Sequence, residues 1–306
     1  MQRFLIERLA LLLPNLLGIS IIVFLLVRAI PGDPAVLMVG DLGTPEDIAY
    51  FRQKWGLDRP LVEQYLRFLS HVGRGEFGRS ILTQSPVIHE LVPRIQATVL
   101  LAATAIVIAI TLGVLAGIAA ALRPYSLVDH GTMILALTGV STPIFWTGLV
   151  LMLIFSVRLQ WLPPGGYGTP WHLLMPAFTL ALFAAGVIAR QARSSLLEVL
   201  GSDYVRTAKA KGLAERQVVS RHALRNALIP VITVAGLQFG QMLGGSILTE
   251  TVFSWPGIGS YLIQGLLGRD YPAVQAAVLV GATWFALVNL LVDLLYGFID
   301  PRIHYA

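Results

Sequence analysis

Long uncharged runs of apolar residues alternate with polar segments along the chain. The first run, residues 9–27, reads LALLLPNLLGISIIVFLLV, and as a helix it is long enough to cross a hydrocarbon core about 30 Å thick. Five further runs follow, near residues 95–121, 131–157, 173–189, 228–249 and 273–292. This pattern predicts an all-α, polytopic integral membrane protein with about six transmembrane helices.

The composition supports the same class. Only 13% of the 306 residues are charged and 56% are hydrophobic, whereas soluble domains carry about 25% charged residues. The first run exceeds the apolar core of a signal peptide, which has about 7–15 residues, and no small-residue cleavage site follows it. The chain has no cysteine, so disulfides and thiolate metal sites are excluded.

Positive charge indicates the orientation. With six spans, both termini share a side with residues 122–130 and 190–227, and these segments together hold twelve Lys and Arg residues. The short opposite loops, residues 158–172 and 251–272, hold two. Because cytoplasmic loops carry the excess of Lys and Arg, both termini and the basic segment are predicted to be cytoplasmic. The pI of about 9.7 is therefore a sign of orientation rather than of nucleic-acid binding.

The predicted organisation has four parts. Residues 1–30 hold the cytoplasmic N-terminus and the first transmembrane helix, and residues 31–94 form a small external subdomain. Residues 95–297 form a transmembrane core of five helices, which includes a cytoplasmic segment at residues 190–230. Residues 298–306 form a cytoplasmic tail.

The external part, residues 31–94, holds seven basic and eight acidic residues, a balance that suits a small folded unit. Within it, LVEQYLRFL at 61–69 predicts a capped amphipathic helix with Leu61, Tyr65 and Phe68 on one face. Residues 251–272 form a second external segment.

Two strings in the external part look like binding motifs but lack the required context. Gly73, Gly75 and Gly78 spell G-x-G-x-x-G, which binds dinucleotides only between a strand and a helix, so a flexible connector is predicted. His89-Glu90 is not followed by a second His at the required spacing, so no metal site and no catalytic site are predicted. The chain also lacks a Gly-Lys dipeptide, hence a Walker A loop, and any ATP is expected to bind another subunit.

Small and polar residues inside the runs have two interpretations each. Glycines recur every four residues, which allows close helix packing either within the chain or at a seam between subunits: Gly113, Gly117, Gly236, Gly240 and Gly244. Gln238, Gln241 and Ser246 are candidates for lining a translocation pathway, because polar side chains at this depth face the bundle or a water-filled cavity. Hydrogen bonding between helices is the alternative.

Eight of the 22 Lys and Arg residues fall between Arg190 and Arg225. Gly212 divides the stretch into two helix-capable pieces, because glycine in a helix interior costs about 1 kcal/mol relative to alanine. The second piece, residues 214–228, has one apolar side and one basic side and ends before Pro230. Such a helix fits an anionic lipid surface or a groove in a cytoplasmic protein. The residues alone leave both open.

The string RTAKAKG at 206–212 resembles the E-A-A-x-x-x-G loop of bacterial ABC importer permeases. Arg206 and Thr207 depart from its first two positions, and both departures are similar to the peptide/nickel subgroup. The likeness extends over nearly the whole chain through FLLVRAIPGDPA at 24–35, GLDRPLVEQYLRFL at 56–69, GEFGRSILTQSPV at 75–87, and GGSILTETVFSWPGIGSYL with RDYPAVQ at 244–275. In this order and spacing the strings are specific for the first permease of dipeptide and oligopeptide systems.

This resemblance implies a type I ABC importer permease in a bacterial inner membrane. The chain would pair with a second, homologous permease, two cytoplasmic ATP-binding subunits that hold ATP and Mg, and an external substrate-binding protein. It would have no cofactor and no catalytic centre of its own. The implied contact with the ATPases involves Arg206, Thr207, Ala208, Lys211, Gly212, Leu213, Ala214 and Glu215. Dipeptides or oligopeptides are the expected substrate, with glutathione and nickel chelates as alternatives.

Two other classes of membrane protein are alternatives to an ABC importer permease. An ion-coupled secondary transporter commonly has two inverted halves and an ionisable group near the middle of the bilayer, and neither is evident in these runs. A membrane scaffold without transport would not require glutamines within a span.

Overall fold

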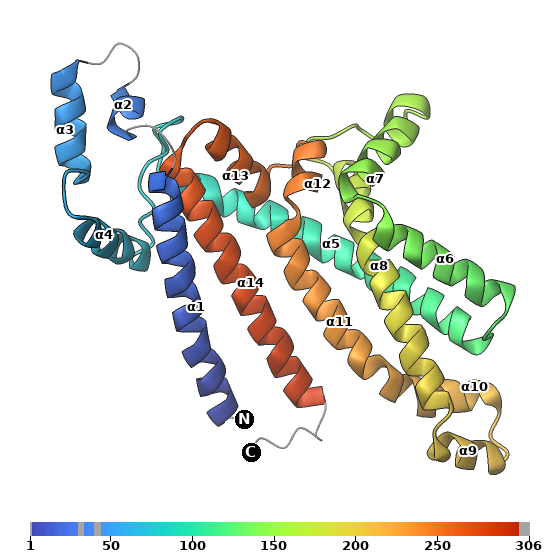
Figure 1. Ribbon diagram of the computed structural model, residues 1–306. Coiled ribbons are helices and arrows are strands. Elements are labelled where there is room, and N and C mark those ends of the chain that lie inside the picture. Colours follow the sequence, from blue (N-terminus) through green and yellow to red (C-terminus); the bar gives the residue numbers. More distant parts are fainter. Residues whose placement is uncertain (1, 30–33, 40–43, 300–306) are drawn as a thin grey trace.

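The computed structural model describes residues 2–29, 34–39 and 44–299, and all the elements named in this part of the chain are helices (Figure 1). The external part contains α2 (Pro34–Val39), α3 (Pro45–Trp55) and α4 (Leu61–Gly73), which follow α1 (Gln2–Ala29). The remaining elements are α5 (Val87–Leu122), α6 (Leu127–Ser141), α7 (Ile144–Leu151), the π-helical η1 (Met152–Arg158), α8 (Pro170–Leu200), α9 (Asp203–Ala210), α10 (Glu215–Gln217), the π-helical η2 (Val218–Ala223), α11 (Leu224–Gly245), α12 (Ile247–Val252), α13 (Ile258–Leu267) and α14 (Tyr271–Ile299).

The predicted apolar runs lie in helices, and an all-α membrane fold is confirmed. The helices α5, α8 and α14, and the helix Glu215–Leu243 that includes most of α11, are each long and apolar enough to cross a membrane. The first predicted span lies in α1, where the described side chains give a shorter apolar helix over Ala10–Leu26.

The predicted span at 131–157 is bent, because α6 and the α7–η1 pair meet at an angle of 104°. Thr142 at the bend has φ −80° and ψ 129°, an extended conformation. Pro143 follows it, and a proline disfavours the helical conformation in the residue before it. The run is therefore a bent pair of helices rather than one straight helix.

Helix α8 is the centre of the bundle and packs against α5, α6 and α11. A Cβ atom at Gly113 would lie 2.8 Å from the Ala185 carbonyl oxygen, and one at Gly117 would lie 2.6 Å from the Ala189 carbonyl oxygen. These glycines of α5 therefore allow the backbone of α8 to approach closely.

The glycines of α11 face α14. A Cβ atom at Gly236 would lie 2.5 Å from Val292, and one at Gly240 would make ordinary contact with Asn289 at 3.4 Å. Gly244 falls in the last turn of α11, outside the residues whose contacts are described. The four described glycines thus pack helices within the chain.

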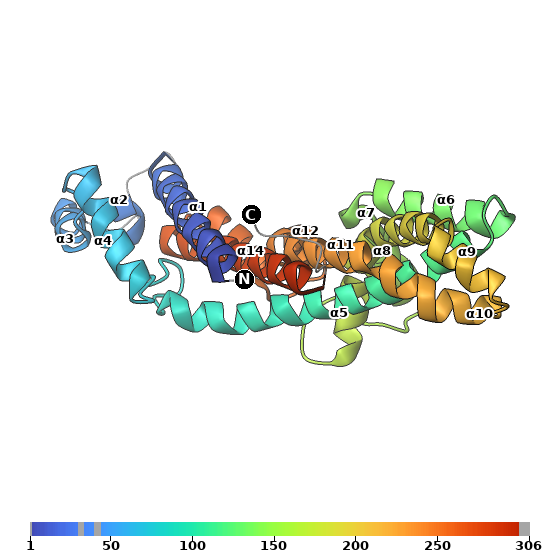
Figure 2. The same cartoon turned by 90° about the horizontal axis from the view of Figure 1, so that it is seen from below.

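Seen from below, the helices spread in one elongated layer (Figure 2). α5 runs along one long side of this layer, with α1–α4 at one end and α6, α9 and α10 at the other. The short helices α9 and α10 project beyond the ends of α8 and α11 (Figure 1).

Candidate functional site

The basic segment forms a turn between two long helices. α8 ends at Leu200, α9 follows, and Gly212 then reverses the chain before α10 begins at Glu215. Gly212 has φ +79°, in the left-handed region that glycine adopts without a steric penalty. No atom lies within 4 Å of the position of a Cβ at Gly212, so backbone conformation rather than crowding favours glycine there.

The predicted short helix at 214–228 does not end before Pro230. α10, η2 and α11 follow one another without a break from Glu215 to Gly245, and Pro230 lies inside α11. Proline is tolerated in membrane helices because neighbouring groups can satisfy the freed backbone carbonyl. The short separate helix of the segment is therefore α9.

The inner side of α9 is fixed to the bundle. Val205 and Ala208 are buried together with Val218 of η2, and Val199 and Leu200 pack against them. The Asn226 side-chain amide donates a hydrogen bond of 2.9 Å to the Tyr204 hydroxyl, which joins α9 to α11. Ala208 was expected to contact an ATPase, but with 7% exposure its side chain packs α9 onto the chain itself.

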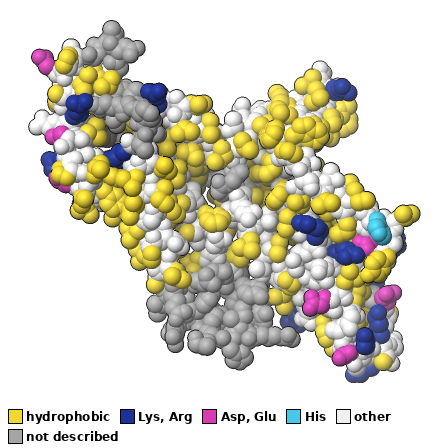
Figure 3. All heavy atoms as spheres, in the orientation of Figure 1, with side chains coloured by type: hydrophobic (Ala, Val, Ile, Leu, Met, Phe, Trp, Pro, Cys, Tyr) yellow, Lys and Arg dark blue, Asp and Glu magenta, His cyan; other side chains and the backbone are white. Residues whose placement is uncertain are grey.

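The outer side of the segment presents the remaining candidate residues. Exposed side chains are Arg206, Thr207, Lys211, Leu213, Ala214 and Glu215. Leu213 is apolar and 38% exposed, and it stands among charged neighbours. Arg206 lies 3.6 Å from Asp203, both exposed, so this ion pair is weak. Positive and negative side chains alternate at this end of the molecule (Figure 3).

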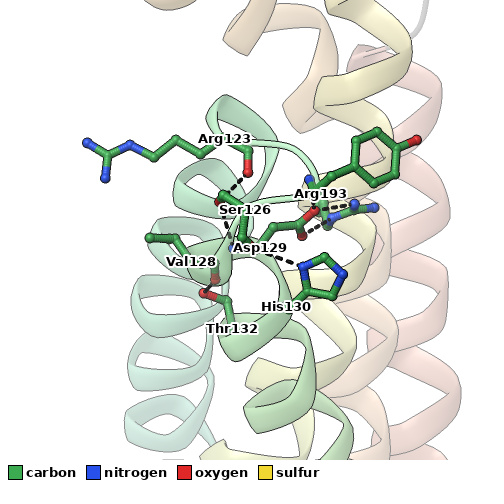
Figure 4. Close-up of polar contacts among 8 residues, drawn as sticks. Arg123, Ser126, Val128, Asp129, His130, Thr132 and Arg193 are labelled. Atoms are coloured by element: carbon green, nitrogen blue, oxygen red, sulfur yellow. Dashed lines mark hydrogen bonds and ion pairs between the residues drawn. The ribbon is translucent and has the colours of Figure 1, made fainter.

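An ion pair that the sequence analysis missed joins α6 to α8 near the same end. The Arg193 guanidinium donates to both carboxylate oxygens of Asp129, at 2.5 Å and 2.6 Å (Figure 4). The Tyr125 backbone N–H donates to the same carboxylate at 2.9 Å, and Ser126 caps the start of α6. A two-point contact of this kind fixes orientation as well as distance. In the sequence, the signal for this ion pair is Asp129 in the first turn of a helix that Ser126 caps.

The candidate pathway residues do not share one surface. Gln241 of α11 is exposed and Gln238 is half-buried. Ser246 is only 2% exposed and donates a 2.7 Å hydrogen bond to Glu250, so its expected role in lining a pathway is wrong for this conformation. The groove between α5 and α11, about 590 Å³, is lined by apolar side chains and Thr111 and contains neither glutamine.

Glu250 is the second group that the sequence analysis missed. Its side chain is completely buried, and it accepts hydrogen bonds from the Thr98 hydroxyl at 2.8 Å, the Ser246 hydroxyl at 2.7 Å and the Ser260 backbone N–H at 2.9 Å. The Thr98 hydroxyl accepts in turn from the Ile258 N–H at 2.9 Å. No Lys, Arg or His within the described ranges forms an ion pair with Glu250. The carboxylate thus joins α5, α12 and the first turn of α13.

Two glycines make room for this carboxylate. A Cβ atom at Gly257 would overlap the Glu250 carboxyl group, and one at Gly259 would lie 2.7 Å from Ile247 Cα. The buried Trp255 indole donates to the Ala97 carbonyl oxygen at 3.0 Å. Residues 246–260 are consequently attached to α5 at two successive positions. Across the described part of the chain, no group of three or more His, Asp or Glu side chains could hold a metal ion.

The chain matches two descriptions of protein families. Residues 109–305 match "Binding-protein-dependent transport system inner membrane component", and residues 1–102 match the N-terminal part of such membrane components.

Several curated proteins are similar over the full length. The di/tripeptide transport system permease protein DppB of Pseudomonas aeruginosa (strain UCBPP-PA14) is 45% identical, with 100% of this chain and 99% of that protein covered. The dipeptide transport system permease protein DppB of Escherichia coli (strain K12) is 44% identical with the same coverage. The glutathione transport system permease protein GsiC of Salmonella paratyphi A (strain ATCC 9150 / SARB42) is 46% identical, with both chains covered completely.

Solved structures share the fold. An inward-facing structure of the MetNI methionine ABC transporter aligns with a TM-score of 0.59 at 18% identity and covers 69% of this chain and 96% of that one. An amino acid ABC transporter with histidines aligns with a TM-score of 0.52 at 17% identity and covers 77% of this chain and 98% of that one.

Proposed function

This chain belongs to the family of binding-protein-dependent transport system inner membrane components, and from that membership we propose that residues 203–218 carry ATPase-driven movement into its transmembrane core. The chain is a polytopic, non-catalytic permease subunit of an ABC importer of the dipeptide type. It works with other components of such an importer. The alternatives of a secondary transporter and a scaffold are excluded by this membership.

One observation carries the coupling proposal: α10, η2 and α11 form an uninterrupted helix from Glu215 to Gly245. A force applied at Glu215 would reach α11 without crossing a flexible joint, and the packing of Val205 and Ala208 against Val218 joins α9 to the same helix. Ala223 and Ala227 at the base of this helix pack with Ala121 of α5 and Leu196 of α8, so the movement would reach two further spans.

The partners follow from the same proposal. A second homologous permease would complete the pore, two cytoplasmic subunits would bind ATP and Mg, and a substrate-binding protein would deliver the substrate from outside. In this arrangement both termini lie in the cytoplasm of a bacterial inner membrane, as the twelve-to-two distribution of Lys and Arg supports. Residues 31–94 and 251–272 are the proposed dock for the binding protein.

Short peptides are the proposed substrate. The di/tripeptide and dipeptide permeases support this choice over the full length of the chain. The glutathione permease, at 46% identity, supports glutathione as the second candidate. Both are small peptides with free carboxylates, so competition between a dipeptide and glutathione in one uptake assay separates them.

The coupling proposal is tested by Leu213→Asp in the purified complex, reconstituted with its binding protein. Leu213 is exposed, so the chain should fold, whereas a carboxylate in an apolar contact with an ATPase would weaken that contact. Substrate-stimulated ATP hydrolysis should fall at least about tenfold, the equivalent of 1.4 kcal/mol. The matched control is Leu127→Asp, because Leu127 is 93% exposed at the same end of the molecule and lies outside the segment. Equal hydrolysis by both variants and the unmodified complex would refute the proposal.

A further inference from the structure

Helix α4 lies across the outer part of α1, at the level of its apolar run (Figure 1). The Tyr65 hydroxyl is 2.8 Å from the Ser20 hydroxyl, and the Tyr65 and Phe68 rings lie 5.3 Å and 5.7 Å from the Phe24 ring. Near the outer end of α1, Arg28 donates to Gln64 at 3.1 Å and 2.8 Å.

These contacts place α4 beside the apolar stretch of α1 rather than beyond its end. The apolar stretch of α1 extends to Leu26, and Ser20 lies six residues before that point. At 1.5 Å per residue, Ser20 is therefore about 9 Å from the end of the stretch. The Tyr65 side chain thus reaches a level at which α1 is apolar.

A second face of α4 is apolar and uncovered. Val62 is 71% exposed and Leu66 is 58% exposed, and both lie one turn apart on the same side. The face that packs on α1 therefore accounts for only part of the apolar surface of the helix.

The third face is charged. Glu63 forms ion pairs with Arg59 and, at 3.2 Å, with Arg67. At about 100° per residue, the α1-facing residues, the exposed apolar residues and the charged residues occupy three sectors centred about 120° apart. This division suits a helix with protein on one side, acyl chains on the second and water or headgroups on the third.

We propose that α4 is an interfacial helix that binds the outer leaflet of the phospholipid bilayer through Val62 and Leu66. The ion-paired Glu63 and Arg67 then face water or headgroups on the third side of the helix. The helix then holds the external subdomain at a fixed height relative to the bilayer. The assignment of the outer leaflet rests on the proposed orientation of the chain; the contact with lipid does not.

The absence of cysteine permits a direct test. Val62→Cys, Leu66→Cys and His71→Cys are labelled with an environment-sensitive fluorophore in the complete complex. The complex is placed in bilayers of phosphatidylethanolamine and phosphatidylglycerol that contain acyl-brominated phosphatidylcholine. His71 is exposed on the side of the same helix that faces away from Val62 and Leu66, and it is the matched control. Labels at Val62 and Leu66 should be quenched at least about threefold more than the label at His71, since an apolar face of this kind enters the acyl boundary.

Equal quenching at the three positions would overturn the proposal. The proposal would also be overturned if the brominated lipid did not quench the label at Val62 because the second permease or the binding protein covered it. A membrane-impermeant thiol reagent applied to spheroplasts tests the orientation separately, because it reaches His71→Cys only if α4 is external. Reaction in inverted vesicles alone would refute the orientation and leave the lipid contact standing.

Discussion

Replacing Glu250 by glutamine keeps the size of the side chain and exchanges one acceptor oxygen for an NH2 donor. The carboxylate accepts from two hydroxyls at Oε1 and from the Ser260 N–H at Oε2. The Thr98 hydroxyl already accepts from Ile258, so its own hydrogen is directed at Glu250. In either orientation, the amide nitrogen of glutamine faces at least one of these donors.

The stability that the complex loses on Glu250→Gln follows from the hydrogen bonds that change. A hydrogen bond to a charged group contributes about 1.5–3 kcal/mol, and a buried donor left unsatisfied costs about 1–3 kcal/mol. Glu250→Gln loses at least one of the former and creates at least one of the latter, so the expected loss of stability is about 2.5–6 kcal/mol. At about 2–4 °C for each kcal/mol in a large domain, such a loss lowers the Tm by roughly 5–24 °C.

The assay is thermal unfolding of the purified complex in detergent, followed by the loss of the monodisperse peak in size-exclusion chromatography. Thr249→Val is the matched control, because Thr249 is also buried in α12 and its hydroxyl has no hydrogen-bond partner within the described ranges. That control should leave the Tm unchanged or raise it. A Tm for Glu250→Gln within 1 °C of the Tm of the unmodified complex would refute the reasoning, because each kcal/mol lost should lower the Tm by about 2–4 °C.

Three further predictions concern the bundle and the coupling segment. Gly117→Val should abolish accumulation of folded complex, since even a Cβ there would lie 2.6 Å from the Ala189 carbonyl oxygen. The control Gly281→Ala should accumulate normally, because no atom lies within 4 Å of the Cβ position. Equal yields of the two variants would contradict the packing argument. Asp129→Asn and Arg193→Gln should each increase proteolysis between α5 and α6, and the double variant should be cut little faster than either single variant. Fully additive effects would show that the pair does not hold α6. Gly212→Pro should abolish substrate-stimulated ATP hydrolysis, because φ +79° is incompatible with a proline ring. Gly212→Asn should retain most of the hydrolysis, because asparagine tolerates this conformation. Normal hydrolysis by the proline variant would contradict a role of this turn in coupling.

Much of the fold could be predicted from charge and apolar pattern, because each run of apolar residues has one stable state in lipid. The break at Thr142 could not, since proline is tolerated in some membrane helices and bends others. Pro143 and Pro230 illustrate both outcomes: the first ends α6, while α11 continues through the second. Which outcome applies depends on neighbouring helices that a linear pattern does not show.

The candidate site was predictable only in part. Gly212 and the exposed residues of the turn follow from local pattern, and the structure places them together. The burial of Ala208 depends on Val218, which approaches only after the chain has reversed. Glu250 and Thr98 are 152 residues apart, so their hydrogen bond lies beyond any local signal. The sequence offered one clue to this site: Glu250 is an acidic residue within an apolar stretch, a few residues before Gly257 and Gly259.

The close contacts around α8 limit the ways in which this subunit can change shape. Besides the two contacts with α5, a Cβ at Gly139 of α6 would lie 2.9 Å from the Leu182 carbonyl oxygen. Backbones this near cannot slide past each other by a fraction of a helical turn without collision. α5, α6 and α8 must therefore travel as one rigid block during transport. Distances between spectroscopic labels on these three helices should stay constant through the cycle, while those from the block to α7 and α14 change.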